Sequence, residues 1–149
     1  MFTTATMRVR NNFRENTLLK FLFALYAIVW VITAIKPLYF TDWVLENILV
    51  VVFVSLIFLT YRFFPLSDLS YMLITLFMIL HAIGAHYTYA EVPFGYWMKG
   101  TFSFSRNHFD RVVHFSFGLL MASPIREVFL GILFSSRCNA IVQRTVRDY

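Results

Sequence analysis

The chain has 149 residues, of which 59% are apolar and only 14% are charged. A soluble domain averages about 45–50% apolar and about 25% charged residues, and a fold of ~150 residues still exposes roughly 30% of its unfolded surface. The composition therefore excludes an ordinary water-soluble domain, a disordered chain and a disulfide-stapled secreted domain. It indicates a small polytopic membrane protein, in which the single Cys138 permits neither an internal disulfide nor a multi-cysteine metal site.

Four apolar stretches are long enough to cross a bilayer as helices, which takes about 17–25 residues. They lie near residues 18–35, 44–61, 69–87 and 108–126. The second is rich in valine, but we expect a helix because a spanning segment must satisfy its own backbone. Pro124, Arg126 and Glu127 are expected to interrupt the fourth. The predicted fold is all-α, a polytopic membrane bundle of about four transmembrane helices within residues 18–134.

The basic residues predict how this bundle is oriented. Nine of the thirteen Lys and Arg residues fall on the side that holds both tails, and four fall on the other side: Lys36, Lys99, Arg106 and Arg111. Cytoplasmic segments are enriched in Lys and Arg, so the tail 1–17 and the basic tail 135–149 are predicted to be cytoplasmic. The loop 88–106 is predicted to face outward, with Pro93–Trp97 packed at the membrane interface. The net charge of +5 then reflects membrane insertion, and no nucleic-acid partner is expected.

All four histidines fall between His81 and His114. His81 lies within the third span, where ionisable side chains usually face the bundle interior or a water-filled cavity. His81 and His86 are about 140° apart on an ideal helix, so they meet at one ligand only if the helix breaks near Gly84. The alternative is that neutral His81 donates one hydrogen bond to a neighbouring helix.

The start of the fourth span also has two interpretations. Asp110 and His114 are four residues apart and share a helix face, so the carboxylate is able to orient the imidazole and raise its basicity. Alternatively, Asn107 caps the helix and Asp110 stabilises its positive end.

Together these residues suggest one candidate site. In it, His81, His86 and His108 are metal ligands for zinc or another divalent ion. Asp110 and His114 form a catalytic acid–base pair, and Arg106 and Arg111 hold an anionic head group. No phosphate-binding loop, zinc-protease motif or dinucleotide fingerprint accompanies them.

Two segments of this region resemble a known family. They are HAIGAHYTYAEVP (81–93) and RNHFDR (106–111), followed by His114-Phe115 and Pro124-Ile125-Arg126-Glu127. They resemble the YjdF-like bacterial inner-membrane proteins, a family of unknown function, which implies an inner-membrane location. The run DRVVHF (110–115) is also similar to VanZ-like membrane proteins, a group linked to glycopeptide (teicoplanin) resistance. YjdF-like proteins usually continue into further spans with acidic motifs, so a truncated or frameshifted carboxy-terminus is expected here.

Three functions remain open from the sequence. The first is a non-catalytic envelope or helix-interaction protein, with the lipid bilayer as its partner and a homo-oligomer as an open alternative. The second is a membrane-embedded, metal-dependent enzyme that acts on a lipid-linked or envelope substrate. The third is a component of a small transporter or channel.

Overall fold

The computed structural model describes the backbone of residues 16–63 and 65–147 and the side chains of residues 16–61 and 65–133. The regular elements in these residues are helices: α1 (Thr17–Ala34), α2 (Phe40–Phe63), α3 (Asp68–His86), α4 (Pro93–Thr101) and α5 (Phe109–Arg147). Four of them, α1, α2, α3 and α5, are long and apolar enough to cross a membrane. The prediction of an all-α bundle with four spans is confirmed.

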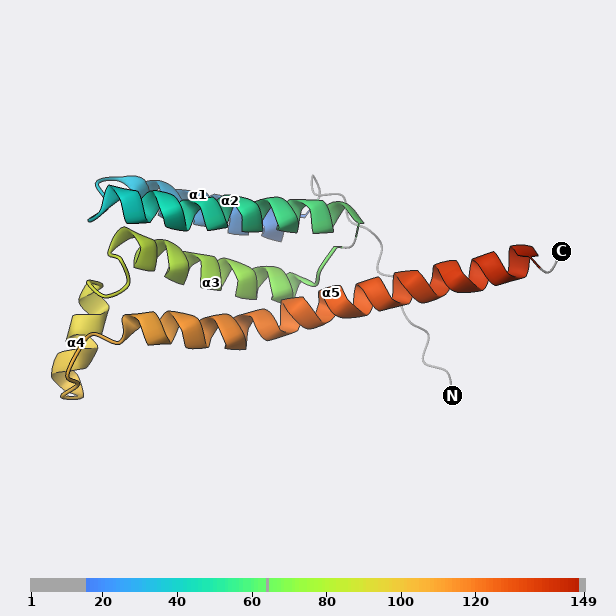
Figure 1. Ribbon diagram of the computed structural model, residues 1–149. Coiled ribbons are helices and arrows are strands. Elements are labelled where there is room, and N and C mark those ends of the chain that lie inside the picture. The colour runs from blue at the N-terminus through green and yellow to red at the C-terminus, as the bar shows by residue number, and fades with distance from the viewer. Residues whose placement is uncertain (1–15, 64, 148–149) are drawn as a thin grey trace.

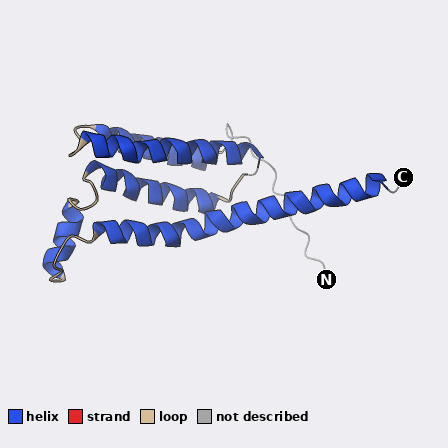
Figure 2. Cartoon of the chain, viewed as in Figure 1, coloured by secondary structure: helices blue, strands red, loops and turns tan. Residues whose placement is uncertain are grey.

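The four long helices run side by side, and the short α4 lies across one end of the bundle (Figures 1 and 2). Helix α3 is central because it packs extensively against both α1 and α5 and more lightly against α2. Its buried positions include the large Tyr71 and Met78 and the small Ala82, Gly84 and Ala85. Small residues let neighbouring helices approach closely within a membrane. The carboxyl end of α3, where these small residues lie, is therefore suited to close packing against other segments of the same protein.

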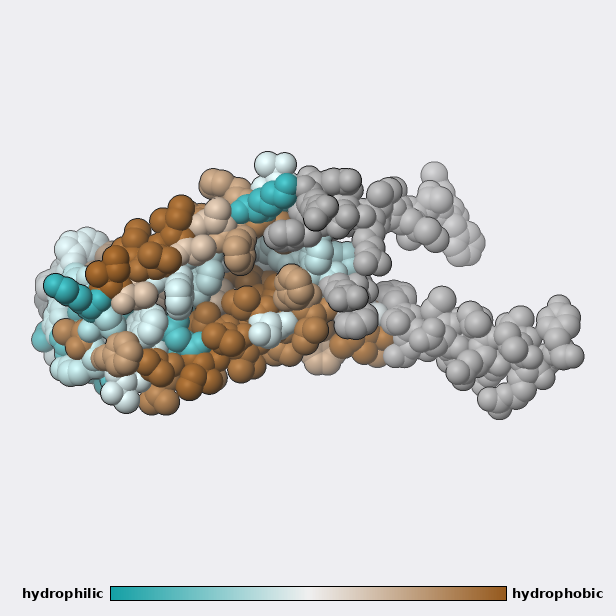
Figure 3. Space-filling model, turned by 90° about the horizontal axis from the view of Figure 1, so that it is seen from above, coloured by the Kyte–Doolittle hydropathy of each residue, from teal (hydrophilic) through white to brown (hydrophobic). Residues whose placement is uncertain are grey.

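The outer faces of α1 and α2 are strongly apolar. Phe21, Phe23 and Phe58 are each more than 60% exposed, and hydrophobic side chains dominate the middle of the face shown in Figure 3. Exposed apolar patches this extensive are rare on soluble monomers. Hydrocarbon lipid chains are the natural cover for this surface.

The predicted interruption of the fourth span at Pro124 is wrong. Helix α5 runs from Phe109 through Pro124 to Arg147. Among the described residues, its stretch apolar enough to span a membrane covers Phe109–Leu133 and so continues past the predicted end at residue 126. Proline is tolerated in transmembrane helices because neighbouring groups satisfy the carbonyl that it leaves free. At 39 residues the helix is about 58 Å long, so it extends well beyond the rest of the bundle (Figure 1).

The two tails are only partly visible. Residues 135–147 of the predicted basic tail continue α5 as helix, but their side chains lie outside the described residues. Residues 1–15 of the predicted amino-terminal tail lie outside the described residues altogether.

The predicted outer loop 88–106 contains a helix that the sequence analysis did not anticipate. Helix α4 has Pro93 in its first turn, where the fixed φ of proline suits helix initiation. Phe94 and Trp97 stack on each other at 5.3 Å and are both exposed. Packing of this aromatic pair at the membrane interface stays a prediction.

Polar contacts tie both ends of α3 to its neighbours. At its start, Glu127 of α5 accepts hydrogen bonds from the backbone N–H (2.7 Å) and hydroxyl (2.5 Å) of Ser67. At its end, the Nδ1 atom of His86 lies 2.8 Å from the carbonyl oxygen of Thr33 in α1, and Leu38 N–H donates to the His86 carbonyl at 3.0 Å. These contacts hold α3 at a defined depth and rotation within the bundle.

Candidate functional site

A cavity of about 1070 Å³ opens at the end of the bundle that carries α4. Ligand pockets typically measure about 300–1,000 Å³, so this one has room for a sizeable molecule. Its apolar walls come from α2, α3 and α5, and include Leu49, Phe53, Phe77 and Phe117. Its polar lining comes from the same helices and from the segment around α4, and includes Glu46, His81, Tyr89, Lys99, Arg106, Asp110 and His114.

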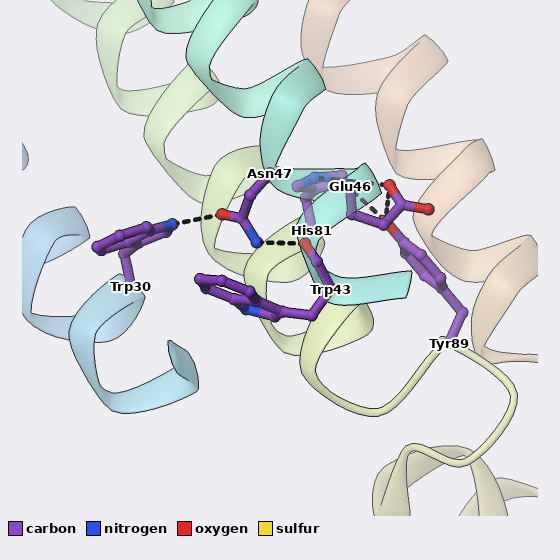
Figure 4. Close-up of polar contacts among 6 residues, drawn as sticks. All are labelled: Trp30, Trp43, Glu46, Asn47, His81 and Tyr89. Atoms are coloured by element: carbon purple, nitrogen blue, oxygen red, sulfur yellow. Dashed lines mark hydrogen bonds and ion pairs between the residues drawn. The ribbon is translucent and has the colours of Figure 1, made fainter. Parts of the chain in front are cut away.

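Three of these side chains form a hydrogen-bonded cluster, the Glu46–Tyr89–His81 network (Figure 4). The Tyr89 hydroxyl lies 3.3 Å from Glu46 Oε2 and 2.8 Å from His81 Nδ1. His81 Nε2 lies 3.9 Å from the same carboxylate oxygen. A hydroxyl has only one proton to donate. In one arrangement, Tyr89 donates to Glu46 and its hydroxyl oxygen accepts from His81 Nδ1–H. In the other, Tyr89 donates to an unprotonated His81 Nδ1.

The chain reversal after α3 places Tyr89 in this network. Thr88 and Tyr89 have φ values of 54° and 57°, in the left-handed region that turns the chain back on itself. Tyr89 N–H donates to the Gly84 carbonyl at 2.7 Å, and a Cβ atom on Gly84 would overlap the Tyr89 ring. Gly84 is therefore needed for a close approach. Helix α3 continues through Gly84 without a break, so the condition for His81 and His86 to meet at one ligand is not fulfilled.

The environment keeps the Tyr89 hydroxyl protonated. Burial raises the pKa of Tyr89, and the negative charge of Glu46 and its hydrogen bond to the phenol raise it further. The phenol thus stays neutral across the physiological range and remains a hydrogen-bond donor at the cavity wall.

Helix α1 supports the position of Glu46 through the next residue, Asn47. Its Oδ1 accepts from Trp30 Nε1 at 2.6 Å, and its Nδ2 donates to the Trp43 carbonyl at 2.7 Å. The rings of Trp30 and Trp43 lie 5.9 Å apart. These contacts fix the rotation of α2 and so direct Glu46 toward α3 (Figure 4).

The start of α5 forms the other wall. Asn107 Oδ1 accepts from Phe109 N–H at 2.9 Å, and its Nδ2 donates to the Val92 carbonyl at 3.0 Å, linking the starts of α5 and α4. The Nδ1 atom of His114 lies 2.7 Å from the backbone oxygen of Asp110. The structure therefore places this imidazole nitrogen on the helix backbone instead of on the Asp110 carboxylate. Within the described part of the chain, Asp110 Oδ1 is buried without a hydrogen-bond partner.

The suggested metal ligands are not brought together. His81 lines the cavity, whereas His86 contacts α1, and His108 packs edge-on against Phe104 at 5.1 Å. Among residues 16–61 and 65–133, no three His, Cys, Asp or Glu side chains are placed to hold a metal ion. The physical reason is that α3 stays helical through Gly84, so His81 and His86 keep different faces. Of the two suggested head-group residues, Arg106 lines the cavity, and the exposed Arg111 does not.

Glu46 is the functional candidate that sequence reasoning passed over. A signal was present, since Glu46 is the only acidic residue between Val44 and Tyr61. Ionisable residues within a span are functional candidates by default. Lys99 was also missed, because it lies on α4, a helix that the sequence did not predict. Asn107 was predicted as a helix cap, and its Oδ1 does bond the start of α5, but its second bond to Val92 was not predicted.

We expect a pH-dependent contact at the rim of the cavity. The Tyr96 hydroxyl donates to the Glu91 carboxylate, and this hydrogen bond, with the carboxylate charge, raises the pKa of Tyr96. The contact is therefore intact below the usual tyrosine pKa of about 10 and is lost as pH rises through the raised value. In a tyrosinate absorbance titration, Glu91→Gln should lower one tyrosine midpoint, and Tyr96→Phe should remove that component. An unchanged curve for Glu91→Gln would contradict this.

The four spans and the cavity define a multi-pass α-helical membrane protein with a polar chamber at one end of its bundle. More particularly, the chain belongs to the DUF2238 family of predicted membrane proteins, whose model matches residues 18–142. It is also similar to the inner membrane protein YjdF of Escherichia coli (strain K12), with 40% identity over 86 residues. The aligned region covers 58% of this chain and 41% of that relative. The chain thus spans about two fifths of the curated relative that it matches.

These comparisons confirm the YjdF-like resemblance, and the name of the relative supports an inner-membrane location. No solved structure matches this chain.

Proposed function

We propose that this protein is a non-catalytic membrane protein that binds an amphiphilic envelope molecule in its cavity. The observation that carries this proposal is the make-up of the cavity: one part is polar, with the Glu46–Tyr89–His81 network and Arg106, and the other is apolar. An amphiphile matches both parts at once, because its head group satisfies the polar side chains and its hydrocarbon part covers the apolar wall.

The charges of the lining indicate the kind of head group. Arg106 and Lys99 supply positive charge, while Glu46, Glu91 and Asp110 supply negative charge. A head group with acidic oxygens and with hydroxyl or amine donors satisfies both sets.

A binding role is favoured over catalysis by the partners of the histidines. His81 is engaged with Tyr89, and the Nδ1 atom of His114 is engaged with its own helix backbone. Glu46, whose Oε2 lies 3.9 Å from His81 Nε2, also accepts a hydrogen bond from Tyr89. The Nδ1 atom of His114 is not directed at the Asp110 carboxylate, as it would be in an acid–base couple.

One observation keeps an enzyme as a second candidate. Asp110 lines the cavity, and its buried Oδ1 has no hydrogen-bond partner among the described residues. With His81 as the proton acceptor, such a site would act on a lipid-linked or envelope substrate. Turnover of an envelope-lipid extract, or stoichiometric zinc in the purified protein, would favour this candidate over simple binding.

The binding proposal is tested by the lipids that accompany the purified protein. Native mass spectrometry should detect a bound amphiphile, and Arg106→Ala should weaken its binding about tenfold, as expected for one charge-assisted hydrogen bond. Arg111→Ala is the matched control, because Arg111 lies near the same end but outside the cavity lining. Equal occupancy in both variants, or no bound amphiphile in the parent protein, would contradict the proposal.

We further propose that both termini are cytoplasmic and that the cavity opens on the outer side, as the distribution of basic residues indicates. After Cys138→Ser, a membrane-impermeant maleimide should label Ser103→Cys in spheroplasts. Thr145→Cys should be labelled only after lysis. The reverse pattern would overturn this orientation.

A homo-oligomer remains a separate proposal, which the molecular mass of the purified complex tests.

A further inference from the structure

A second hollow continues from the cavity toward the opposite end of the bundle. It measures about 310 Å³ and lies between α2, α3 and α5, lined mainly by apolar side chains such as Met121, Ile125 and Phe129. It shares Phe53 and Leu56 with the larger cavity. Over the described residues, α2 and α5 both pack on α3 but not closely on each other. The two hollows therefore adjoin at Phe53 and Leu56, and together they are named the α2–α5 groove.

The groove is deeper than one leaflet of a bilayer. Glu46 lines its polar end and Thr60 its far end, and a helix advances about 21 Å between these positions at about 1.5 Å per residue. One leaflet contributes about half of the ~30 Å hydrocarbon core. A molecule that fills the groove from Glu46 to Thr60 therefore reaches past the bilayer midplane.

The volume distinguishes between the two apolar occupants that a membrane offers. The second hollow follows α2 for about 10 Å, from Phe53 to Thr60, and a helix about 10 Å across displaces roughly 800 Å³ over that length, more than twice the 310 Å³ available. A single hydrocarbon chain is much thinner. Leu56, Ile125 and Phe129 are 46–64% exposed along the groove, so a chain lying there would cover them.

We propose that the α2–α5 groove holds the single long hydrocarbon chain of a phosphate-bearing lipid, whose head group occupies the polar cavity. This rests on the proposed amphiphile binding and names the class of ligand. The phosphate lies within reach of Arg106 and Lys99, the two cationic side chains of the lining. The chain enters sideways from the bilayer, because α2 and α5 leave the groove open between them.

The proposal predicts that affinity depends on chain length. Farnesyl phosphate and the longer solanesyl phosphate are titrated into the detergent-solubilised full chain, and binding is read by native mass spectrometry. The longer lipid should bind at least about tenfold more tightly, because each additional buried methylene contributes to binding. Solanesol, which lacks the phosphate, should bind much more weakly than solanesyl phosphate.

A bulky side chain in the far part of the groove provides the structural test. Ile125→Trp should abolish the advantage of solanesyl phosphate over farnesyl phosphate, because the indole fills the far part of the groove. A helical circular dichroism spectrum and a thermal midpoint close to those of the parent protein show that the variant is folded. Leu119→Trp is the matched control, since Leu119 is 64% exposed on the same helix and lines neither hollow. The control should keep the chain-length dependence.

Other outcomes would overturn the proposal in distinguishable ways. Equal affinities for the two phosphates, or no effect of Ile125→Trp, would exclude a chain in the groove but leave amphiphile binding intact. Equal binding of solanesol would exclude recognition of the phosphate. Failure of every amphiphile to bind would overturn the proposed function itself. Disulfide crosslinking between two chains that carry Ile125→Cys in a Cys138→Ser background is a further measurement. If the crosslink forms to the same extent with and without solanesyl phosphate, a second copy of the chain occupies the groove.

Discussion

Replacing Gly84 with alanine is expected to displace Tyr89 and to lower the stability of the bundle by about 1–3 kcal/mol, the usual cost of overpacking. The added Cβ atom would overlap the Tyr89 ring, which lies directly over Gly84. Neither side yields easily, because Gly84 is buried within α3 and the Tyr89 backbone is bonded to the Gly84 carbonyl. The expected readouts are a lower thermal midpoint in detergent and loss of amphiphile binding.

Gly118→Ala is the matched control for this experiment. Gly118 also lies within a spanning helix, but a Cβ atom there meets nothing within 4 Å. Alanine has the higher helix propensity by up to about 1 kcal/mol, so this control should be neutral or slightly stabilising. If Gly84→Ala and Gly118→Ala give the same thermal midpoint and the same amphiphile binding, the close approach to Gly84 does not determine the position of Tyr89.

Removing the Tyr89 hydroxyl is the second substitution with a large expected effect. Tyr89→Phe keeps the ring over Gly84 but deletes the group shared by Glu46 of α2 and His81 of α3. Hydrogen bonds between membrane helices average about 0.6 kcal/mol and reach about 1.7 kcal/mol. Because two partners are left unsatisfied, we expect a loss of about 1–2 kcal/mol, measured by unfolding of the purified protein.

A double-mutant cycle tests whether this loss arises in the network. Tyr89→Phe and Glu46→Gln should each destabilise the protein, and the double variant should lose less than the sum of the two. Tyr87→Phe is the control, since the Tyr87 ring packs against His86 at 4.4 Å, outside the network. Strict additivity, or an equal loss for Tyr87→Phe, would contradict the network.

The bounds of a span were predicted correctly where the hydrophobicity of that segment alone decides where the helix lies. Residues 69–87 were predicted and Asp68–His86 is observed for α3, because an uninterrupted apolar run has few alternatives in a bilayer. Prediction failed at Pro124, because the rule that proline ends a helix holds for soluble helices, whereas transmembrane helices tolerate proline. It also missed α4, a nine-residue helix too short to show a clear apolar period.

The candidate site was predicted less completely than the fold. His81 was correctly singled out as an ionisable group within a span, and it lines the cavity. The two residues that it engages were not linked to it, because Glu46 lies 35 positions earlier and Tyr89 is placed by a left-handed turn. His86 was grouped with His81 on sequence proximity, yet it faces α1.

The sequence by itself determined that the part of the chain that the structure describes contains four helices apolar enough to cross a membrane, and roughly where α1, α2 and α3 begin and end. Hydrophobicity, length and helix-ending residues are properties of one segment at a time, so they can be recognised without knowing which other helices that segment packs against. Only the tertiary structure decided that Glu46, His81 and Tyr89 meet, that His86 does not join them, and that α2 and α5 leave a groove. These outcomes depend on how each helix is rotated about its own axis, and that rotation is set by packing and hydrogen bonding between helices, such as the Trp30–Asn47 contact.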